Sequence, residues 1–190
     1  MTGETRTPRG AAGGPPGLPR YTFLWAFLVG IALLTLIRPC LRRVPEPPPV
    51  QGAFPAVDLI GAGGGVIRGI SLRGSVWVLS LENQPCDAPC QERRGRMKEL
   101  ADAYKDFHLG GIRLLDVDIG PDVPADPAPP LWLAARIGED ELDAFGGAAR
   151  IGHLLIVDPS GGLRGWYQGD KDGFNEVYNR AQHVRAAAHQ

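Results

Sequence analysis

The sequence predicts an α/β domain that follows an apolar N-terminal helix, and three observations support this prediction. First, composition changes near residue 50, because half of the 18 prolines lie before it. Second, uncharged strand-like runs alternate with helical apolar stripes beyond that point. Third, the first buried strand-like run leads directly into two cysteines. A chain of 190 residues has room for one such domain and an appendage.

The N-terminal helix is predicted from an uncharged apolar run. Residues 21–37 form seventeen consecutive residues without a charge, which would span about 26 Å as a helix at about 1.5 Å per residue. Arg20 and Arg38 flank the run as interfacial anchors. A cleaved signal peptide is the alternative, but no small-residue cleavage site follows. We therefore expect a disordered tail over 1–20, a transmembrane anchor over 21–38 and a Pro-rich linker over 39–52.

Charge leaves the orientation of this anchor open, because three arginines precede the run and three follow it. An N-terminal anchor commonly delivers its domain outward. We therefore expect a single-pass protein of the cell inner membrane with its globular domain on the periplasmic side. The residues before Cys40 are not small, so this cysteine is no lipoprotein signal, and we expect no catalytic role for it.

The first half of the globular domain, expected over 53–188, reads as a βαβ unit. A Gly-rich turn between 54–59 and 66–70 predicts an extra hairpin. The uncharged run 76–81 predicts a strand buried on both faces. A helix beginning near Gln91 and a parallel strand over 112–119 follow. The helix is predicted from apolar residues at intervals of three and four, namely Met97, Leu100, Ala101, Tyr104 and Phe107.

The second half reads as a short helix, a hairpin and a final helix. After a loop with five prolines over 121–130, a short helix is expected over 139–145. Strands over 154–157 and 163–167 form the hairpin. An apolar stripe through Phe174 and Val184 predicts the last helix, with Asp170 or Asp172 as its N-cap. This order of elements is that of the thioredoxin-like fold.

Cys86, Cys90 and His153 are the candidate site residues. Cysteines four apart at a loop-to-helix junction favour thiolates, because the helix end supplies free N–H groups and a positive dipole. Two thiolates select Cu(I), and a neutral imidazole is an acceptable third ligand, whereas zinc would need a fourth. His153 opens the hairpin strand and so faces the cysteine loop in this fold. The alternatives are a structural histidine and a structural disulfide, since the two Cα atoms would be about 6 Å apart.

Three motifs over residues 54–185 resemble the Sco/SenC family of copper chaperones, which help to assemble the copper centre of cytochrome c oxidase. They are the C-x-x-x-C of Cys86 and Cys90 after a strand, a histidine before V-D-P-x-G at 153–161, and Val117-Asp118 with Asp122 four residues on. The resemblance implies that Cys86, Cys90 and His153 bind copper as Cu(I), and leaves Cu(II) open. The family usually has proline after each cysteine, but here Asp87 and Gln91 follow.

The sequence therefore predicts a membrane-anchored copper chaperone, a metal carrier rather than an enzyme. Its expected partner is the copper-binding subunit of cytochrome c oxidase, or another copper or thiol protein. The alternative is a thiol-disulfide oxidoreductase in which Cys86 and Cys90 are catalytic, and a third hypothesis is a domain with an inert disulfide. Nucleic acid is excluded as a partner, because 20 basic residues against 21 acidic ones form no basic stripe.

Overall fold

The computed structural model describes residues 20–41, 46–107, 109–122 and 131–188. The chain divides into two compact units, residues 1–43 and 44–190. In the first unit, helix α1 covers Arg20–Leu41. Among the described residues, no helix is both long and apolar enough to cross a membrane. The predicted transmembrane anchor over 21–38 is thus not confirmed, and residues 1–19 and 42–45 of the predicted tail and linker lie outside the described residues.

The second unit contains one mixed sheet. Its described strands follow the order β1-β8-β7-β4-β5-β6-β2-β3. In the centre, β4 pairs in parallel with β5 and antiparallel with β7. The strand bounds are β1 Gly52–Ala53, β2 Leu59–Gly61, β3 Val66–Ile67, β4 Val76–Asn83, β5 Ile112–Ile119, β6 Trp132–Ile137, β7 His153–Val157 and β8 Gly162–Gln168.

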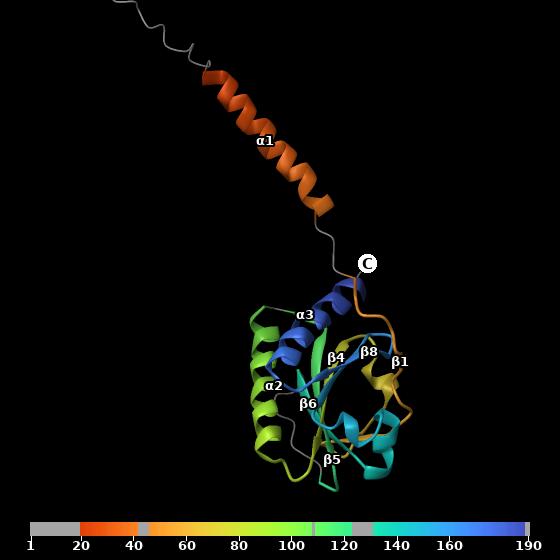
Figure 1. Ribbon diagram of the computed structural model, residues 1–190. Coiled ribbons are helices and arrows are strands. Elements are labelled where there is room, and N and C mark those ends of the chain that lie inside the picture. Colours follow the sequence, from red (N-terminus) through yellow and green to blue (C-terminus); the bar gives the residue numbers. More distant parts are fainter. Residues whose placement is uncertain (1–19, 42–45, 108, 123–130, 189–190) are drawn as a thin grey trace, which may run out of the picture. The chain divides into compact units, whose positions relative to one another are not determined.

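Helices cover both faces of this sheet (Figure 1). Helices α2 (Ala88–Asp106) and α3 (Lys171–Ala188) pack on one face, where they meet Val76 and Val78 of β4. The short 3₁₀ helices η1 (Gly69–Leu72) and η2 (Glu139–Phe145) pack on the other face, and η3 (Ala148–Arg150) leads into β7. A strand that is covered on both faces buries every side chain, which explains the continuous apolar run of β4.

Most of the predicted elements are confirmed. The predicted βαβ unit is β4, α2 and β5, the hairpin is β7 with β8, and α3 is the last helix. The Asp170 carboxylate accepts a hydrogen bond from the Gly173 amide at 2.8 Å, which confirms the predicted N-cap. The N-terminal hairpin is shorter than predicted, with strands β2 and β3 only. Strand β6 was not predicted, and it lies between β5 and β2.

Candidate functional site

The two cysteines lie where β4 passes into α2. Strand β4 ends at Asn83, and the loop leads to Asp87, the N-cap of α2. The Asp87 carboxylate accepts a hydrogen bond from the Cys90 amide at 2.9 Å, and Pro89 sits in the first turn, where its missing N–H costs nothing. This local sequence starts the helix between Cys86 and Cys90, so that one sulfur belongs to the loop and the other to the first turn.

Cys86 and Cys90 form a disulfide with their Cα atoms 5.4 Å apart. This separation falls within the normal range for disulfides, so the alternative considered from the sequence is the state found in the structure. Cys90 is buried, with 2% of its surface exposed, whereas Cys86 is partly exposed. An attacking thiolate therefore reaches the sulfur of Cys86 more easily than that of Cys90.

His153 opens β7, next to the strand that leads to the cysteines. Its neighbour Gly152 donates its amide hydrogen to the Leu81 carbonyl of β4 at 2.7 Å, and His153 itself pairs with Gln168 of β8. The imidazole is partly buried, and its Nδ1 lies 3.3 Å from the Ile151 carbonyl oxygen. A donor role for Nδ1 in this contact would leave Nε2 as the nitrogen with a free lone pair.

The described residues contain no group of three His, Cys, Asp or Glu side chains arranged to hold a metal ion. Cys86, Cys90 and His153 thus lie on neighbouring elements without forming a ready metal site. The two sulfurs are bonded to each other, and only thiolates are good ligands for metal. The donor set is chemically suited to Cu(I) once the disulfide is reduced.

A buried charged cluster lies beside the cysteine loop, on the sheet face that α2 covers. On β4 and β5 the residues that face α2 are apolar in the first half of each strand and polar toward its carboxyl end. There Ser80 lies opposite Asp116, and Glu82 opposite Asp118, in the register of the two strands. Helix α2 supplies the cations. The shortest contacts of the cluster are the ion pairs of Arg93 with Glu82 and of Arg94 with Asp118, and the hydrogen bond that the Ser80 hydroxyl donates to Asp116.

Burial alters the acidity of two of these carboxyls. It raises the pKa of Asp116 to about 6, because the attraction of Arg94 and the hydrogen bond from Ser80 offset the desolvation only in part. It also raises the pKa of Glu82, against the opposing effect of Arg93. From the sequence, Asp118 was noted only as part of a motif, and Glu82, Arg93 and Asp116 were not identified as site residues. The available signal was that charged residues occupy alternate positions of strands otherwise predicted to be buried.

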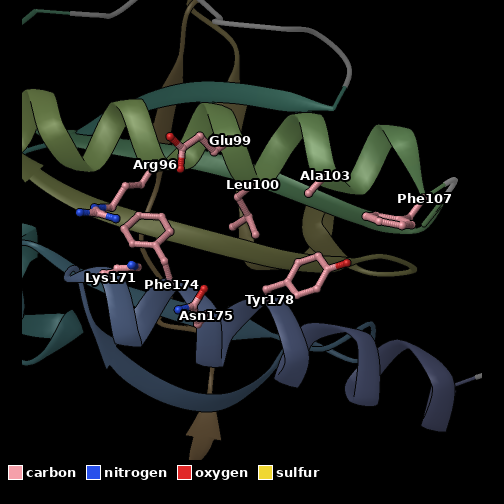
Figure 2. Close-up of a pocket in the computed structure, with 9 residues that line it drawn as sticks. All are labelled: Arg96, Glu99, Leu100, Ala103, Phe107, Lys171, Phe174, Asn175 and Tyr178. Atoms are coloured by element: carbon pink, nitrogen blue, oxygen red, sulfur yellow. The ribbon is translucent and has the colours of Figure 1, made fainter.

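Two of the cavities that border α2 bear on the site. One, of about 400 Å³, opens beside the partly exposed Cys86 and is lined by Gln84, Pro85, Cys86, Arg94, Pro121 and Asp122. The other, also about 400 Å³, is a groove between α2 and α3, whose lining residues are drawn in Figure 2. The buried Leu100 and Phe174 contribute to its apolar lining, Arg96 and Lys171 lie at one end, and Phe107 lies at the other. None of the predicted site residues lines this groove, whereas the first cavity contains Cys86.

Comparison with known proteins supports the fold. No family model matches the sequence, and no curated protein matches it significantly. Among solved structures, BsSco, "a member of the Sco family of cytochrome c oxidase assembly proteins", matches with a TM-score of 0.59 and 17% identity, covering 74% of this chain and 97% of its own. A SCO1/SenC family lipoprotein from Bacillus anthracis gives 0.60 and 15%, covering 76% and 99%.

A third similar structure represents another function. The thioredoxin domain of a thiol-disulfide oxidoreductase from Bacteroides vulgatus matches with a TM-score of 0.51 and 17% identity, covering 68% of this chain and 95% of its own. At such identities the three likenesses establish the fold alone. The protein has the thioredoxin-like α/β fold, and its structural neighbours include Sco/SenC proteins and a thiol-disulfide oxidoreductase.

Proposed function

We propose that this protein is a Cu(I) chaperone of the Sco/SenC type, in which the reduced Cys86 and Cys90 bind the ion together with His153. One observation carries the proposal. The strand that opens with His153 is paired with the strand that ends in the cysteine loop. The two soft sulfurs and the imidazole therefore belong to adjoining elements at one end of the sheet. A small movement of the cysteine loop on reduction would complete a three-coordinate site.

The chemistry of loading begins with the disulfide. A two-electron reductant converts the Cys86–Cys90 bond into two thiols, and Cu(I) then displaces their protons. The N-terminus of α2 would favour the thiolates through its positive dipole end, since Pro89 has no N–H and the Cys90 amide already donates to Asp87. A three-coordinate site remains open to a thiolate or an imidazole of an acceptor protein, so the ion can be passed on without release into water.

The acceptor and the location belong to the same proposal. BsSco, one of the structural neighbours, is described as a cytochrome c oxidase assembly protein, and we propose the copper-binding subunit of that enzyme as the acceptor. Disulfides persist mainly in oxidising compartments, which supports a domain on the periplasmic side of the inner membrane. Attachment to that membrane would involve the apolar residues of α1.

A competition titration tests copper binding. The full-length protein is reduced, and Cu(I) is divided between it and a chromophoric chelator, for wild type, Cys86→Ser and His153→Ala. We expect one tightly bound Cu(I) in wild type, loss of binding in Cys86→Ser and about tenfold or more weaker binding in His153→Ala. His183→Ala, on α3, is the matched control and keeps wild-type affinity. A wild type that cannot compete with the chelator, or unchanged binding by His153→Ala, overturns the proposal.

A second candidate function, thiol-disulfide exchange, is favoured by the disulfide itself and by the cavity beside Cys86. A partner thiolate would attack the Cys86 sulfur, the Cys86–Cys90 bond would break, and Cys90 would leave as a thiolate. Attack by a second partner thiolate on the mixed disulfide would then release the oxidised partner and the reduced Cys86. In this function His153 holds no metal.

Trapping of mixed disulfides distinguishes the two functions. Each of the variants Cys86→Ser and Cys90→Ser keeps one of the two site thiols. The reduced variants are incubated with an excess of a disulfide-bonded peptide, and the mixed disulfides are measured by mass spectrometry. If exchange is the function, Cys90→Ser traps the peptide on Cys86 much faster than Cys86→Ser traps it on buried Cys90. Equal and slow trapping in both variants would exclude this second function and leave copper binding unaffected.

A further inference from the structure

We infer that Arg93 is a positioning residue that fixes His153 relative to the two cysteines, and this inference rests on the proposed copper-binding function. Arg93 connects three elements of the site. It belongs to α2, it pairs with the end of β4, and it packs against Gly152 and Gly169, which flank the His153–Gln168 pair of β7 and β8.

The first connection is between α2 and β4. Arg93 lies one helical turn beyond Cys90, on the same side of α2. Its Nε and Nη2 donate to the two carboxylate oxygens of Glu82 at 2.7 and 2.6 Å. Only 18% of the Arg93 side chain and 1% of the Glu82 side chain are exposed. This buried bidentate pair holds the cysteine-bearing turn of the helix against the end of the central strand.

The second connection is between Arg93 and the start of β7. A Cβ atom added at Gly152 would lie 3.2 Å from Arg93 Cζ, and one added at Gly169 would collide with both Arg93 Cδ and the Gly152 carbonyl oxygen. Gly152 directly precedes His153, and Gly169 directly follows Gln168, the β8 partner of His153. The two glycines are thus in contact with each other, and the Arg93 side chain packs against both of them, next to the His153–Gln168 pair.

The neighbouring arginine provides a contrast. Arg94 also makes a short ion pair with a buried carboxylate, since its Nη2 lies 2.6 Å from Asp118 Oδ1. Its contacts within the described residues run to β5 and to the cavity beside Cys86, on the side of β4 away from β7. Arg93 and Arg94 therefore stabilise the fold in similar ways, but only Arg93 touches the backbone that carries His153.

The planar shape of the guanidinium matters for this role. It packs against the backbone at Gly152 while it presents two parallel N–H groups to Glu82, and a lysine ammonium cannot make this bidentate pair. Arg93→Lys keeps the charge and the ion pair with Glu82 but loses the packing of the guanidinium against Gly152. We expect the strand carrying His153 to lose its fixed distance from α2, so that the imidazole contributes less to binding.

The test is a double-mutant cycle on Cu(I) affinity with wild type, Arg93→Lys, His153→Ala and the double variant, all full length and reduced. We expect Arg93→Lys to weaken Cu(I) binding by about 10- to 100-fold, as is typical of residues that orient metal ligands. When Arg93→Lys is already present, adding His153→Ala should weaken Cu(I) binding little further. X-ray absorption of the Cu(I) complexes should show two sulfurs and one nitrogen in wild type and two sulfurs in Arg93→Lys.

Two further variants separate positioning from general stability. Arg94→Lys is the matched control, which should keep the nitrogen ligand whatever its effect on the melting temperature. Glu82→Gln leaves Arg93 in place but weakens its anchor, and should reduce the nitrogen contribution as Arg93→Lys does. If the Cu(I) complexes of both Arg93→Lys and Glu82→Gln keep the nitrogen ligand, the role of Arg93 is overturned, while the proposed copper-binding function stands. Failure of wild type to bind Cu(I) overturns the proposed function instead.

Discussion

Substitution of the buried Asp116 tests the electrostatics of the charged cluster. Burial raises the pKa of this carboxyl from an ordinary value of 3.8 to about 6. Between these two values the folded protein holds a proton that the unfolded chain has lost, so the free energy of unfolding falls as pH rises through this window. A gap of about two pKa units corresponds to about 3 kcal/mol. The penalty is absent below pH about 4 and complete above pH about 7.

Asp116→Asn removes the ionisation and keeps an oxygen that accepts the hydrogen bond from Ser80. We therefore expect this variant to match wild type at pH 4 and to be more stable by up to about 3 kcal/mol at pH 7.5. Urea unfolding of the oxidised protein, followed by tryptophan fluorescence at both values, measures the difference. Asp118→Asn is the matched control and should destabilise at pH 7.5, because it breaks the short ion pair with Arg94.

The opposite result for Asp116→Asn would refute this reasoning. Arg94 Nε lies 3.9 Å from Asp116 Oδ2 and has no hydrogen-bond partner among the described residues. If Asp116→Asn is destabilising at pH 7.5, the attraction of Arg94 outweighs the cost of burial, and Asp116 is an anion in the folded protein. If the difference in free energy of unfolding between Asp116→Asn and wild type does not change with pH, a titrating carboxyl at residue 116 is likewise excluded.

Two other predictions concern stability outside the cluster. Gly95 lies exposed within α2 with no atom within 4 Å of an added Cβ, so Gly95→Ala should raise the free energy of unfolding by about 1 kcal/mol in urea titrations. Burial alone would raise the pKa of Asp158, but hydrogen bonds from Ser160, Gly162 and Arg164 hold it below its ordinary value. We therefore expect Asp158→Ala to lower the free energy of unfolding by about 3 kcal/mol at pH 7. This loss should shrink as pH falls through the lowered pKa of the wild-type carboxyl. A loss of stability that is independent of pH would contradict the role of its charge.

Local sequence patterns were sufficient for the elements that form the centre of the fold. The uncharged run of β4, the helical stripe of α2 and the hairpin of β7 and β8 each have a period that can be read from neighbouring residues. Strand β6 has no such pattern, because its sequence WLAARI combines small, aromatic and charged residues. Its strand conformation comes from pairing with β5 on one side and β2 on the other, which are both distant in sequence.

The site was predictable to a different extent. The spacing of Cys86 and Cys90 permitted both a metal pair and a disulfide, and only the arrangement of the sulfurs in the structure selects the disulfide. Copper binding by His153 stays a prediction. The charged cluster escaped the sequence reasoning, because the inward direction of Glu82 and Asp116 depends on the register between β4 and β5. A shift of one residue in either strand would turn these side chains to the opposite face.

The charged cluster also determines where the cysteines can lie. Glu82 and Asp118 are directly paired at the ends of β4 and β5, and both are almost completely buried. Buried carboxylates without partners would be costly, so the fold requires two cations above them. Consecutive residues of α2, Arg93 and Arg94, meet this requirement by pairing with opposite members of the carboxylate pair. The helix therefore cannot slide by one residue without breaking both ion pairs, and this constraint holds Cys90, one turn earlier, at the end of the sheet where β7 begins.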